Sequence, residues 1–575
     1  MSTLFESLLT TDPLDNYEDI DKYTTHWLPK IEQYRQNLVD AIPEKYTVEL
    51  PQSTDKLIQD QFNAVDYLYK EKLLTPEEFA ITDLPTVELV AKIASGELTS
   101  VEVFEAYAHR AVLAHQFTNC AMELFIAEGL KQAEERDAYF KEHGKTVGPL
   151  HGVPISLKEH FGYEAKVTHS GYVSRLDNIS SEHCVTVNIL EKLGAVFYIR
   201  TTEPQSLMHL DSYNNITGFT KNPYNLLLSS GGSSSGEGAV VGFGGSSMGV
   251  GTDIGGSIRG PAAFSGCFGL RPTSQRTSLS GVGCSDPGAE SILAVLGPLA
   301  RSVDDIDLWM KSYLNQGNPW ELDSSCLRME WRDVAKPKPE TMTVAVMRDD
   351  GLVRVSPPIR RGIQYVVDKL KQNGVKVIEF TPIKTDVAYK LINKLYNCDG
   401  NAGQRKVLSD SGEPLGKLTK WFLNYGKGAK ILGISEINRL NIIKHELRDE
   451  YNKYLVDNKV DFILSPTYNN VAPHSGEVYN WSYTALWNIL DLPTLVFPTG
   501  LYQDPKVDKW TEEDLKYEFR SPLEQMENEN YHPDQFIGAP IGLQLSGKKY
   551  FDEEVVAAGK TIVDILEVDL FKNIL

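Results

Sequence analysis

The sequence predicts an α/β fold: a large mixed, mostly parallel, twisted β-sheet covered by helices on both faces, with a helical extension at its N-terminus. Two observations predict this class. Short apolar stretches alternate with longer stretches of helical periodicity over most of the chain, which is the pattern of a sheet covered on both faces. The chain also has 575 residues, of which 41% are hydrophobic, so it can bury a core of that size.

The predicted extension comprises residues 1–85. It alternates acidic loops with short helical patterns, and Trp27, Ile31 and Tyr34 fall on one helical face. We expect this extension to wrap the main domain, residues 86–575.

Helix and strand signals become sharp from Thr99 onward. Thr99 and Glu102 form a capping box, which begins a long amphipathic helix. A second helix is predicted to end at Gly144, and the following LHGVPISL predicts a strand whose far end carries Lys158. Because sites in α/β sheets lie at the carboxyl ends of strands, Lys158 is well placed for chemistry. The next strand is predicted at residues 196–199.

The second half continues the alternation. A strand at 343–346 precedes a helix that begins at Ser356-Pro357 and stops at Gly374. Further strands are predicted at 375–380, 462–464, 495–497 and 541–545. A polar insertion is predicted at 503–536, and a closing helix from Asp552 onward.

Charge and composition exclude several classes of partner. Lys and Arg number 57 against 78 Asp and Glu, a net charge of −21, and this balance repels nucleic acid and anionic membranes. The six cysteines lack C-x-x-C spacing, so no metal site and no disulfide framework is expected. The sequence contains no run of 18 apolar residues and no basic leader, so we expect no membrane span and a cytoplasmic location. Weak association with a membrane surface remains open.

The densest run of glycine and serine lies at residues 231–276, GGSSSGEGAVVGFGGSSMGVGTDIGGSIRGPAAFSGCFGLRPTSQR. Gly-rich turns aim several backbone N–H groups at one point, which suits a phosphate or an oxyanion. A phosphate loop would carry Gly-Lys-Ser/Thr, which the sequence lacks. The hydroxyls of Ser233 and Ser257 instead suggest a nucleophile, for which a lysine can serve as base. The nearest lysine in a structured context is Lys158.

These two stretches, GVPISLKEHF and the run from Gly231, resemble the amidase signature family of serine hydrolases. Over roughly residues 30 to 570 the chain is similar to the fungal acetamidase branch and, more loosely, to fatty acid amide hydrolase. The resemblance implies the amidase signature fold and a Ser-Ser-Lys triad. It implies Ser257 as nucleophile, Ser233 as relay after a cis peptide bond, and Lys158 as base. Burial should lower the pKa of Lys158 so that the amine can be neutral.

The resemblance also implies the surroundings of the triad. The backbone N–H groups of Ile254, Gly255, Gly256 and Ser257 form the expected oxyanion hole. The substrate-binding set further includes Ser233 and Leu207; Leu207, Met208 and Leu210 would lie near the acyl part of the substrate, or else serve only as core contacts. Three residues are expected to brace the glycine turns: Ser234, Asp253 and Arg259.

A rival interpretation rests on Gly232-Ser233-Ser234-Ser235-Gly236, which satisfies G-x-S-x-G, the nucleophile elbow of α/β-hydrolases. Ser234 would then be the nucleophile, with His474 or His532 as base. That interpretation leaves the Lys158 motif unexplained. Among the histidines, His160 is of interest because it lies beside the lysine in sequence.

By resemblance, the function expected is hydrolysis of small carboxamides such as acetamide through an acyl-enzyme, without metal or other cofactor. Carbamate esters such as urethane and longer acyl amides are alternatives with the same mechanism. A different class is an amidotransferase subunit that supplies ammonia within a complex.

The 405–455 segment, aromatic and basic, is expected to be a lid over the active site, with a membrane contact as the alternative. The expected partner is a small amide, and the chain is a monomer or a homodimer.

Overall fold

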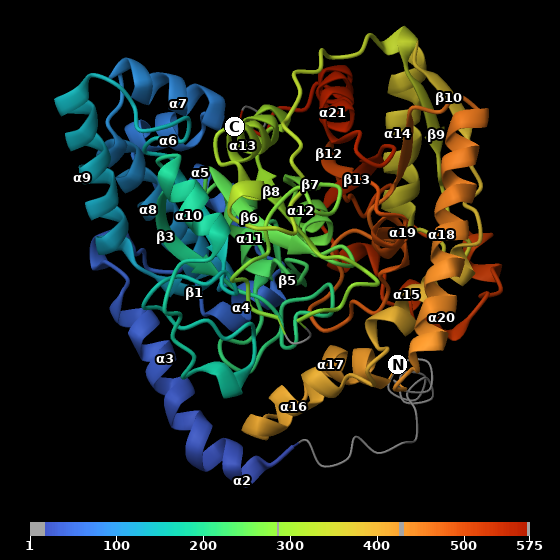
Figure 1. Ribbon diagram of the computed structural model, residues 1–575, viewed down its shortest axis with the longest axis horizontal. Coiled ribbons are helices and arrows are strands. Elements are labelled where there is room, and N and C mark those ends of the chain that lie inside the picture. The colour runs from blue at the N-terminus through green and yellow to red at the C-terminus, as the bar shows by residue number, and fades with distance from the viewer. Residues whose placement is uncertain (1–17, 285–286, 425–429, 572–575) are drawn as a thin grey trace.

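The computed structural model describes residues 18–284, 287–424 and 430–571. Within these ranges an eleven-stranded sheet has the order β1-β3-β2-β6-β8-β7-β12-β13-β11-β9-β10, and β4 pairs separately with β5 (Figure 1). The strands are β1 Ala121–Leu124, β2 Pro154–Lys158, β3 Val196–Thr201, β4 Lys221–Asn222, β5 Asn225–Ser229, β6 Met248–Asp253, β7 Phe268–Arg271, β8 Val295–Ala300, β9 Thr343–Val346, β10 Lys376–Glu379, β11 Phe462–Pro466, β12 Thr494–Tyr502 and β13 Pro540–Ser546.

Parallel pairing is confined to two groups of three strands. In the first group β2 lies between β3 and β6, and in the second β9 lies between β10 and β11. The remaining six of the ten pairings in the described sheet are antiparallel. The α/β class and the large mixed sheet are confirmed. The antiparallel share is larger than we expected, because β7 and β8, and β12 and β13, follow each other along the chain and pair without the crossover that parallel neighbours need.

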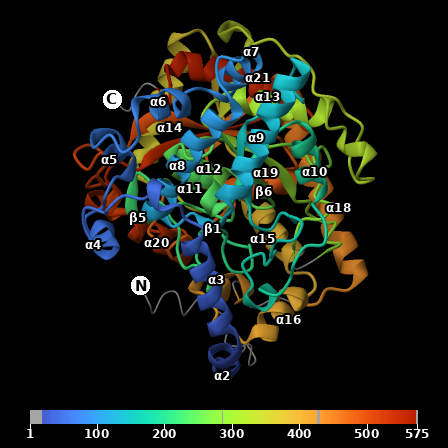
Figure 2. The same ribbon diagram turned by 90° about the vertical axis from the view of Figure 1, so that its left-hand side faces the viewer.

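Helices cover both faces of the sheet (Figures 1 and 2). For example, α9 packs on β3, α11 on β6 and α21 on β12. The helices of the main domain are α8 Ser100–Thr118, α9 Ile126–His143, α10 Val185–Lys192, α11 Ser235–Phe243, α12 Arg259–Phe264, α13 Val303–Asn315, α14 Pro357–Gln372, α15 Thr385–Tyr396, α16 Ala402–Ser411, α17 Lys417–Asn424, α18 Ile434–Asp457, α19 Ser482–Leu490, α20 Pro522–Glu529 and α21 Asp552–Leu566.

Local signals in the sequence set several of these boundaries. Thr99 Oγ1 accepts from the N–H of Glu102 at 3.1 Å, and the Glu102 carboxylate accepts from the N–H of Thr99 at 2.8 Å. This reciprocal pair confirms the predicted capping box before α8. The predicted helix from Pro357 to Gly374 is likewise confirmed as α14, which ends just before Gly374 with φ +89°.

In the described residues, the α-helices that precede α8 are α2 Ile20–Lys22, α3 Leu28–Asp40, α4 Thr54–Gln59, α5 Ala64–Lys70 and α6 Pro76–Thr82 in the predicted extension, and α7 Thr86–Ser95 at the start of the main domain. Trp27 and Ile31 pack against Val173, Leu176 and Ile216 in a cluster of their own. The main hydrophobic core includes residues from Leu38 through Leu566. Because the extension shares that core, its boundary at residue 85 stays a prediction.

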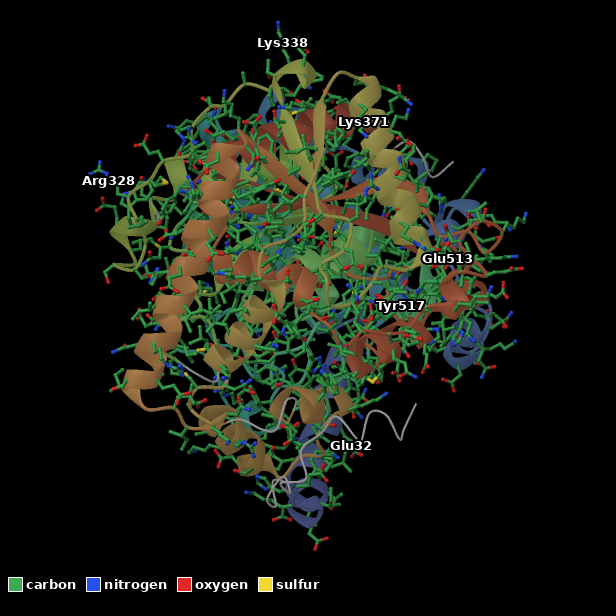
Figure 3. All side chains as sticks on the ribbon, turned by 90° about the vertical axis from the view of Figure 1, so that its right-hand side faces the viewer. Glu32, Arg328, Lys338, Lys371, Glu513 and Tyr517 are labelled. Atoms are coloured by element: carbon green, nitrogen blue, oxygen red, sulfur yellow. The ribbon has the colours of Figure 1, made fainter. Side chains whose placement is uncertain are left out.

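Charged side chains lie at the surface of the molecule, as the exposed Lys338, Lys371 and Glu513 do in Figure 3. None of the helices in the described ranges combines the length and the apolar character that crossing a membrane would require.

Candidate active site

Lys158 is the last residue of β2, at the carboxyl end of the middle strand of the first parallel group. Its side chain is fully buried. The Nζ atom lies 2.7 Å from Ser233 Oγ and 3.2 Å from Thr252 Oγ1. The end of the strand therefore places an amine within hydrogen-bond reach of the Gly- and Ser-rich stretch.

The surroundings of this amine favour its neutral form. Burial lowers the pKa of Lys158 to about 8, against the opposing pull of the carboxyls of Glu203, Asp253 and Glu237. A group with this pKa is partly deprotonated near neutral pH, as a general base must be.

Ser233 lies in the tight turn before α11. The Gly232–Ser233 peptide bond is cis, as the resemblance implied. A side chain at position 232 would place its Cβ only 2.0 Å from the carbonyl oxygen of Asp211, so this position needs glycine. The close approach brings Ser233 against the end of β2, where its hydroxyl meets Lys158.

Ser257 follows β6 in a loop that Asp253 holds in place. The Asp253 carboxylate accepts from the N–H groups of Gly256 at 2.9 Å and Ile258 at 3.1 Å, and from Asn488 at 2.8 Å. Arg259 donates to both carboxylate oxygens, at 3.0 and 3.1 Å. Burial acts to raise the pKa of Asp253, but Arg259, Asn488 and Arg271 together lower that pKa to about 2. Asp253 and Arg259, two of the three expected bracing residues, thus form a buried ion pair within the loop.

Two side chains from later helices fix the carbonyl groups of the same loop. The Tyr396 hydroxyl, at the end of α15, donates to the carbonyl oxygen of Ile254. Thr484 Oγ1, in α19, donates to that of Gly255 at 2.6 Å. Because these two hydroxyls hold the carbonyl groups of Ile254 and Gly255, the orientation of the adjoining peptide groups is fixed before a substrate arrives.

The predicted oxyanion hole is only partly free in the structure. The N–H of Gly256 donates to Asp253 and so cannot also bind an oxyanion. The N–H groups of Ile254, Gly255 and Ser257 make no hydrogen bond within the described residues. Three of the four expected donors are therefore available.

The two serine segments are joined directly, since the N–H of Ser234 donates to the carbonyl oxygen of Ser257 at 3.1 Å. The Ser233 and Ser257 hydroxyls line the same cavity, although no hydrogen bond joins them in the described structure. Catalytic hydrogen bonds are often long without substrate. Ser234 is fully buried, and its hydroxyl faces the backbone of Thr252. Among the described residues no histidine is hydrogen-bonded to Ser234, so the geometry gives no support to a nucleophile elbow.

The cavity at Ser257 has a volume of about 760 Å³ and is mainly apolar. Leu207 and Met208 line it, while Leu210 lines a smaller hollow that also reaches Ser257. Gln404, directly before the 405–455 segment, and Ile437, within it, border the cavity. Residues 425–429 of that segment lie outside the described residues, so its role as a lid stays a prediction.

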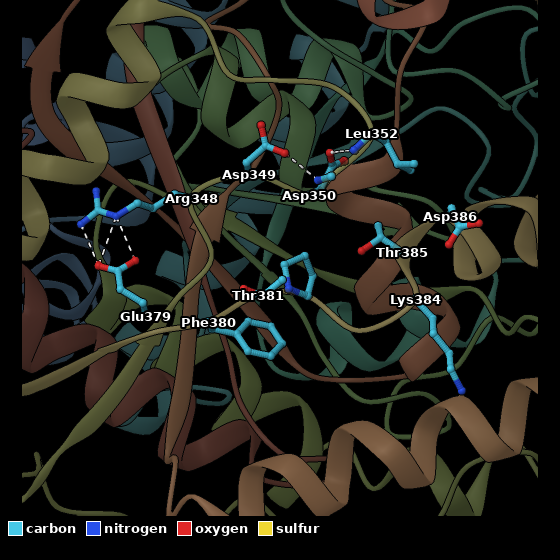
Figure 4. A pocket seen from close by; sticks show the side chains of 12 residues that line it. Arg348, Asp349, Asp350, Leu352, Glu379, Phe380, Thr381, Lys384, Thr385 and Asp386 are labelled. Carbon is cyan, nitrogen blue, oxygen red and sulfur yellow. Dashed lines mark hydrogen bonds and ion pairs between the residues drawn. The ribbon is translucent and has the colours of Figure 1, made fainter. Parts of the chain in front are cut away.

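A second hollow, of about 580 Å³, lies at the carboxyl ends of β9 and β10 (Figure 4). Its charged groups are mostly bound to one another or to backbone. Arg348 pairs with Glu379 at 3.0 Å, and Asp350 accepts from the N–H of Leu352 at 2.8 Å. Neither Ser233 nor Ser257 lines it, so it is separate from the candidate active site.

Sequence reasoning missed several groups that contact the site. Thr252 binds Lys158, and the buried Glu237 accepts from Ser156 at 2.6 Å and from Thr201 at 2.7 Å. Glu237 lies within the Gly- and Ser-rich stretch, where an acid among small residues was the available signal. Tyr396 and Thr484 come from elements far along the chain, and no local pattern marks them.

One buried group in the described chain has the residue types of a metal site: Glu159, His169 and Glu203. Its hydrogen bonds argue for another role. Glu159 already accepts from the N–H groups of His169 and Ser170, at 2.7 and 2.9 Å, and the Arg200 guanidinium lies 3.6 Å away. Burial and then the charge of Glu159 raise the pKa of Glu203. These features suit a proton shared by two carboxyl groups better than a cation beside Arg200.

Known proteins resemble this chain over nearly its whole length. The family model described as Amidase matches residues 102–556. Acetamidase from Emericella nidulans is 36% identical over 92% of this chain and 97% of its own, and acetamidase from Aspergillus oryzae is 35% identical with the same coverage. The solved structure of a fatty acid amide hydrolase superposes with a TM-score of 0.98 and 69% identity, covering 98% of this chain and 100% of the other.

The family match spans most of the residues that form the sheet, the Gly- and Ser-rich stretch and the cavity. The names of the acetamidases and of the fatty acid amide hydrolase agree with it, and the solved structure shares the fold of this chain. The chain therefore belongs to the amidase family and is an amide-hydrolysing enzyme.

Proposed function

We propose that the protein hydrolyses amides of long or bulky apolar acyl groups through an acyl-enzyme on Ser257. Ser257 attacks the carbonyl carbon, its proton passes to Ser233, and the Ser233 proton passes to Lys158. The C–N bond then breaks as the amine leaves with a proton returned along the same route, and water releases the acid. The N–H groups of Ile254, Gly255 and Ser257 bind the oxyanion.

The contact that carries this mechanism is the hydrogen bond of 2.7 Å between Lys158 Nζ and Ser233 Oγ. The amine is buried, and its lowered pKa of about 8 lets it accept a proton near neutral pH. Asp253 and Arg259 act by bracing the loop rather than by touching the substrate.

The volume of the cavity is the observation that favours an amide with a long or bulky acyl group. Pockets of roughly 300–1,000 Å³ hold drug-sized ligands, and about 760 Å³ lies well within that range. Acetamide, with four heavy atoms, would fill only a small part. The similarity to fatty acid amide hydrolase supports the same choice. This order reverses the expectation from sequence, in which acetamide came first.

Acetamide hydrolysis remains the second candidate, because acetamidases are 36% and 35% identical over 92% of the chain. The test is a comparison of kcat/KM for acetamide, benzamide, ethyl carbamate and a fatty amide such as oleamide, using the purified chain without any partner. We expect the fatty amide to give the highest value and Ser257→Ala to abolish all four activities. A higher value for acetamide would refute the long-chain proposal, and activity only with an added protein would favour an amidotransferase subunit.

A further inference from the structure

A line of hydrogen bonds runs from a loop at the cavity to the amine of Lys158. His160 Nδ1 lies 2.9 Å from the carbonyl oxygen of Gly283. On the other side of the ring, His160 Nε2 lies 3.0 Å from Thr252 Oγ1. Thr252 Oγ1 in turn lies 3.2 Å from Lys158 Nζ, which lies 2.7 Å from Ser233 Oγ.

The direction of each bond follows from the first one. A carbonyl oxygen only accepts, so the Nδ1 atom of His160 must carry hydrogen. Burial, and then the nearby Lys158, lower the pKa of His160 well below its usual value, so the ring is neutral and Nε2 can only accept. Thr252 must therefore give its single hydroxyl hydrogen to His160. Only lone pairs of Thr252 then remain to face the amine.

We propose that His160 is a positioning residue for the base: by holding the hydroxyl hydrogen of Thr252, it compels Lys158 to donate an N–H to Thr252 and to keep its lone pair for Ser233. This inference rests on the proposed function, in which that lone pair takes the proton of Ser233. His160 and Thr252 keep their own hydrogens throughout, so the proton balance of the reaction is unchanged. Without His160, the Thr252 hydroxyl could turn and donate to the same lone pair, in competition with Ser233.

Other charged groups also face this amine and must be considered in any pH profile. They come from several elements that pack around β2. Glu203 after β3, Asp253 on β6 and Glu237 on α11 act on the amine of Lys158, and Glu159 after β2 and Arg200 on β3 act on the neutral ring of His160. None of them is altered by the substitutions at Thr252, which makes those substitutions the cleaner probe of the pH profile.

An alkyl fluorophosphonate measures the base without requiring the natural substrate. The serine oxygen forms a bond to phosphorus, fluoride leaves, and the serine proton passes to Lys158 through Ser233. We expect His160→Phe to slow labelling of Ser257 about tenfold, the effect of one hydrogen bond. His160→Gln, whose amide oxygen can accept from Thr252, should recover most of that loss. His115→Phe, which removes a histidine of α8 that accepts from the N–H of Ala121, should leave the rate unchanged.

The substitutions at Thr252 provide an independent test. Thr252→Val removes an acceptor that stabilises the ammonium more than the amine, so the rise of labelling rate with pH should move to lower pH. Thr252→Ser should leave that rise in place. Thermal unfolding of each variant identifies any that fail to fold, and the Thr252 pair decides the matter should His160→Phe be among them.

The outcomes separate this inference from the proposed function. Equal labelling rates for the wild type and His160→Phe, or equally slow rates for His160→Phe and His160→Gln, would overturn the role of His160. An unshifted profile in folded Thr252→Val would do the same. A pH profile that survives Lys158→Ala, or labelling at a residue other than Ser257, would instead overturn the proposed function.

Discussion

Replacing Asp253 by Asn tests whether the loop at Ser257 must be held from within. The carboxylate accepts hydrogen bonds from Gly256, Ile258, Arg259 and Asn488. Its pKa is lowered from 3.8 to about 2, which corresponds to about 2 kcal/mol of stability at neutral pH. Because the pKa is lowered on folding, this contribution is complete above the unfolded pKa and is lost as the pH falls from about 4 towards 2.

Asp253→Asn should lower the free energy of unfolding by more than the pKa shift alone implies, because it leaves the Arg259 guanidinium buried without its counter-charge. Breaking a buried ion pair typically lowers the free energy of unfolding by about 3–5 kcal/mol. Because the amide of Asn keeps only one accepting oxygen, one of the two N–H groups of Gly256 and Ile258 would also lose its acceptor. If the neighbouring oxyanion donors shift as a result, labelling of Ser257 by an alkyl fluorophosphonate should slow on the order of a hundredfold.

Asp491→Asn provides a matched control. Asp491 is also buried, pairs with Arg271 at 2.8 Å and accepts from Ser274, but it lines neither hollow at Ser257. Urea unfolding at pH 7 should show a similar loss of stability for both variants, while only Asp253→Asn slows labelling of the folded enzyme. If both variants label at the wild-type rate, the reasoning about the loop is refuted.

Three further predictions concern the base, the core beneath it and the cavity. With the pKa of Lys158 at about 8, the neutral amine fraction and hence the labelling rate should rise roughly tenfold between pH 7 and pH 9; stopped-flow or quenched labelling would show it, and a flat profile would contradict it. Gly249→Ala should fold poorly, because its Cβ would lie 1.9 Å from Glu237 Oε2; a wild-type melting temperature would show that Glu237 can move aside. Ala294→Trp, in the cavity wall, should reduce kcat/KM for a fatty amide at least tenfold and spare acetamide; an equal loss for both would argue that the acyl group lies elsewhere.

Local sequence signals predicted the parts of the structure that depend on neighbouring residues. The capping box at Thr99 involves a contact between residues only three positions apart. The strand that ends at Lys158 is recognised from the pattern of that one segment. The Gly- and Ser-rich stretch could also be recognised, since its glycines are required by close backbone approaches such as that of Gly232 to Asp211. The α/β class followed from the same alternation of patterns.

Contacts between distant segments could not be predicted in this way. Tyr396 and Thr484 lie 142 and 229 residues along the chain from the carbonyl groups that they bind, and nothing near them in sequence marks that role. The loss of the Gly256 N–H to Asp253 depends on a rotamer rather than on a motif. Cavity volume depends on how several loops close over Leu207 and Met208, which periodicity does not describe.

The proposed base, relay and nucleophile all lie between positions 158 and 257, whereas much of the cavity wall comes from residues 287–294, from Leu395 to Gln404 and from Ile437. Mutations in those later segments can therefore change which acyl group is admitted while the bond-breaking atoms keep their geometry. Enzymes with the same catalytic residues can therefore differ in the amide that they prefer, because a change of preferred substrate does not require a change in the residues that break the C–N bond.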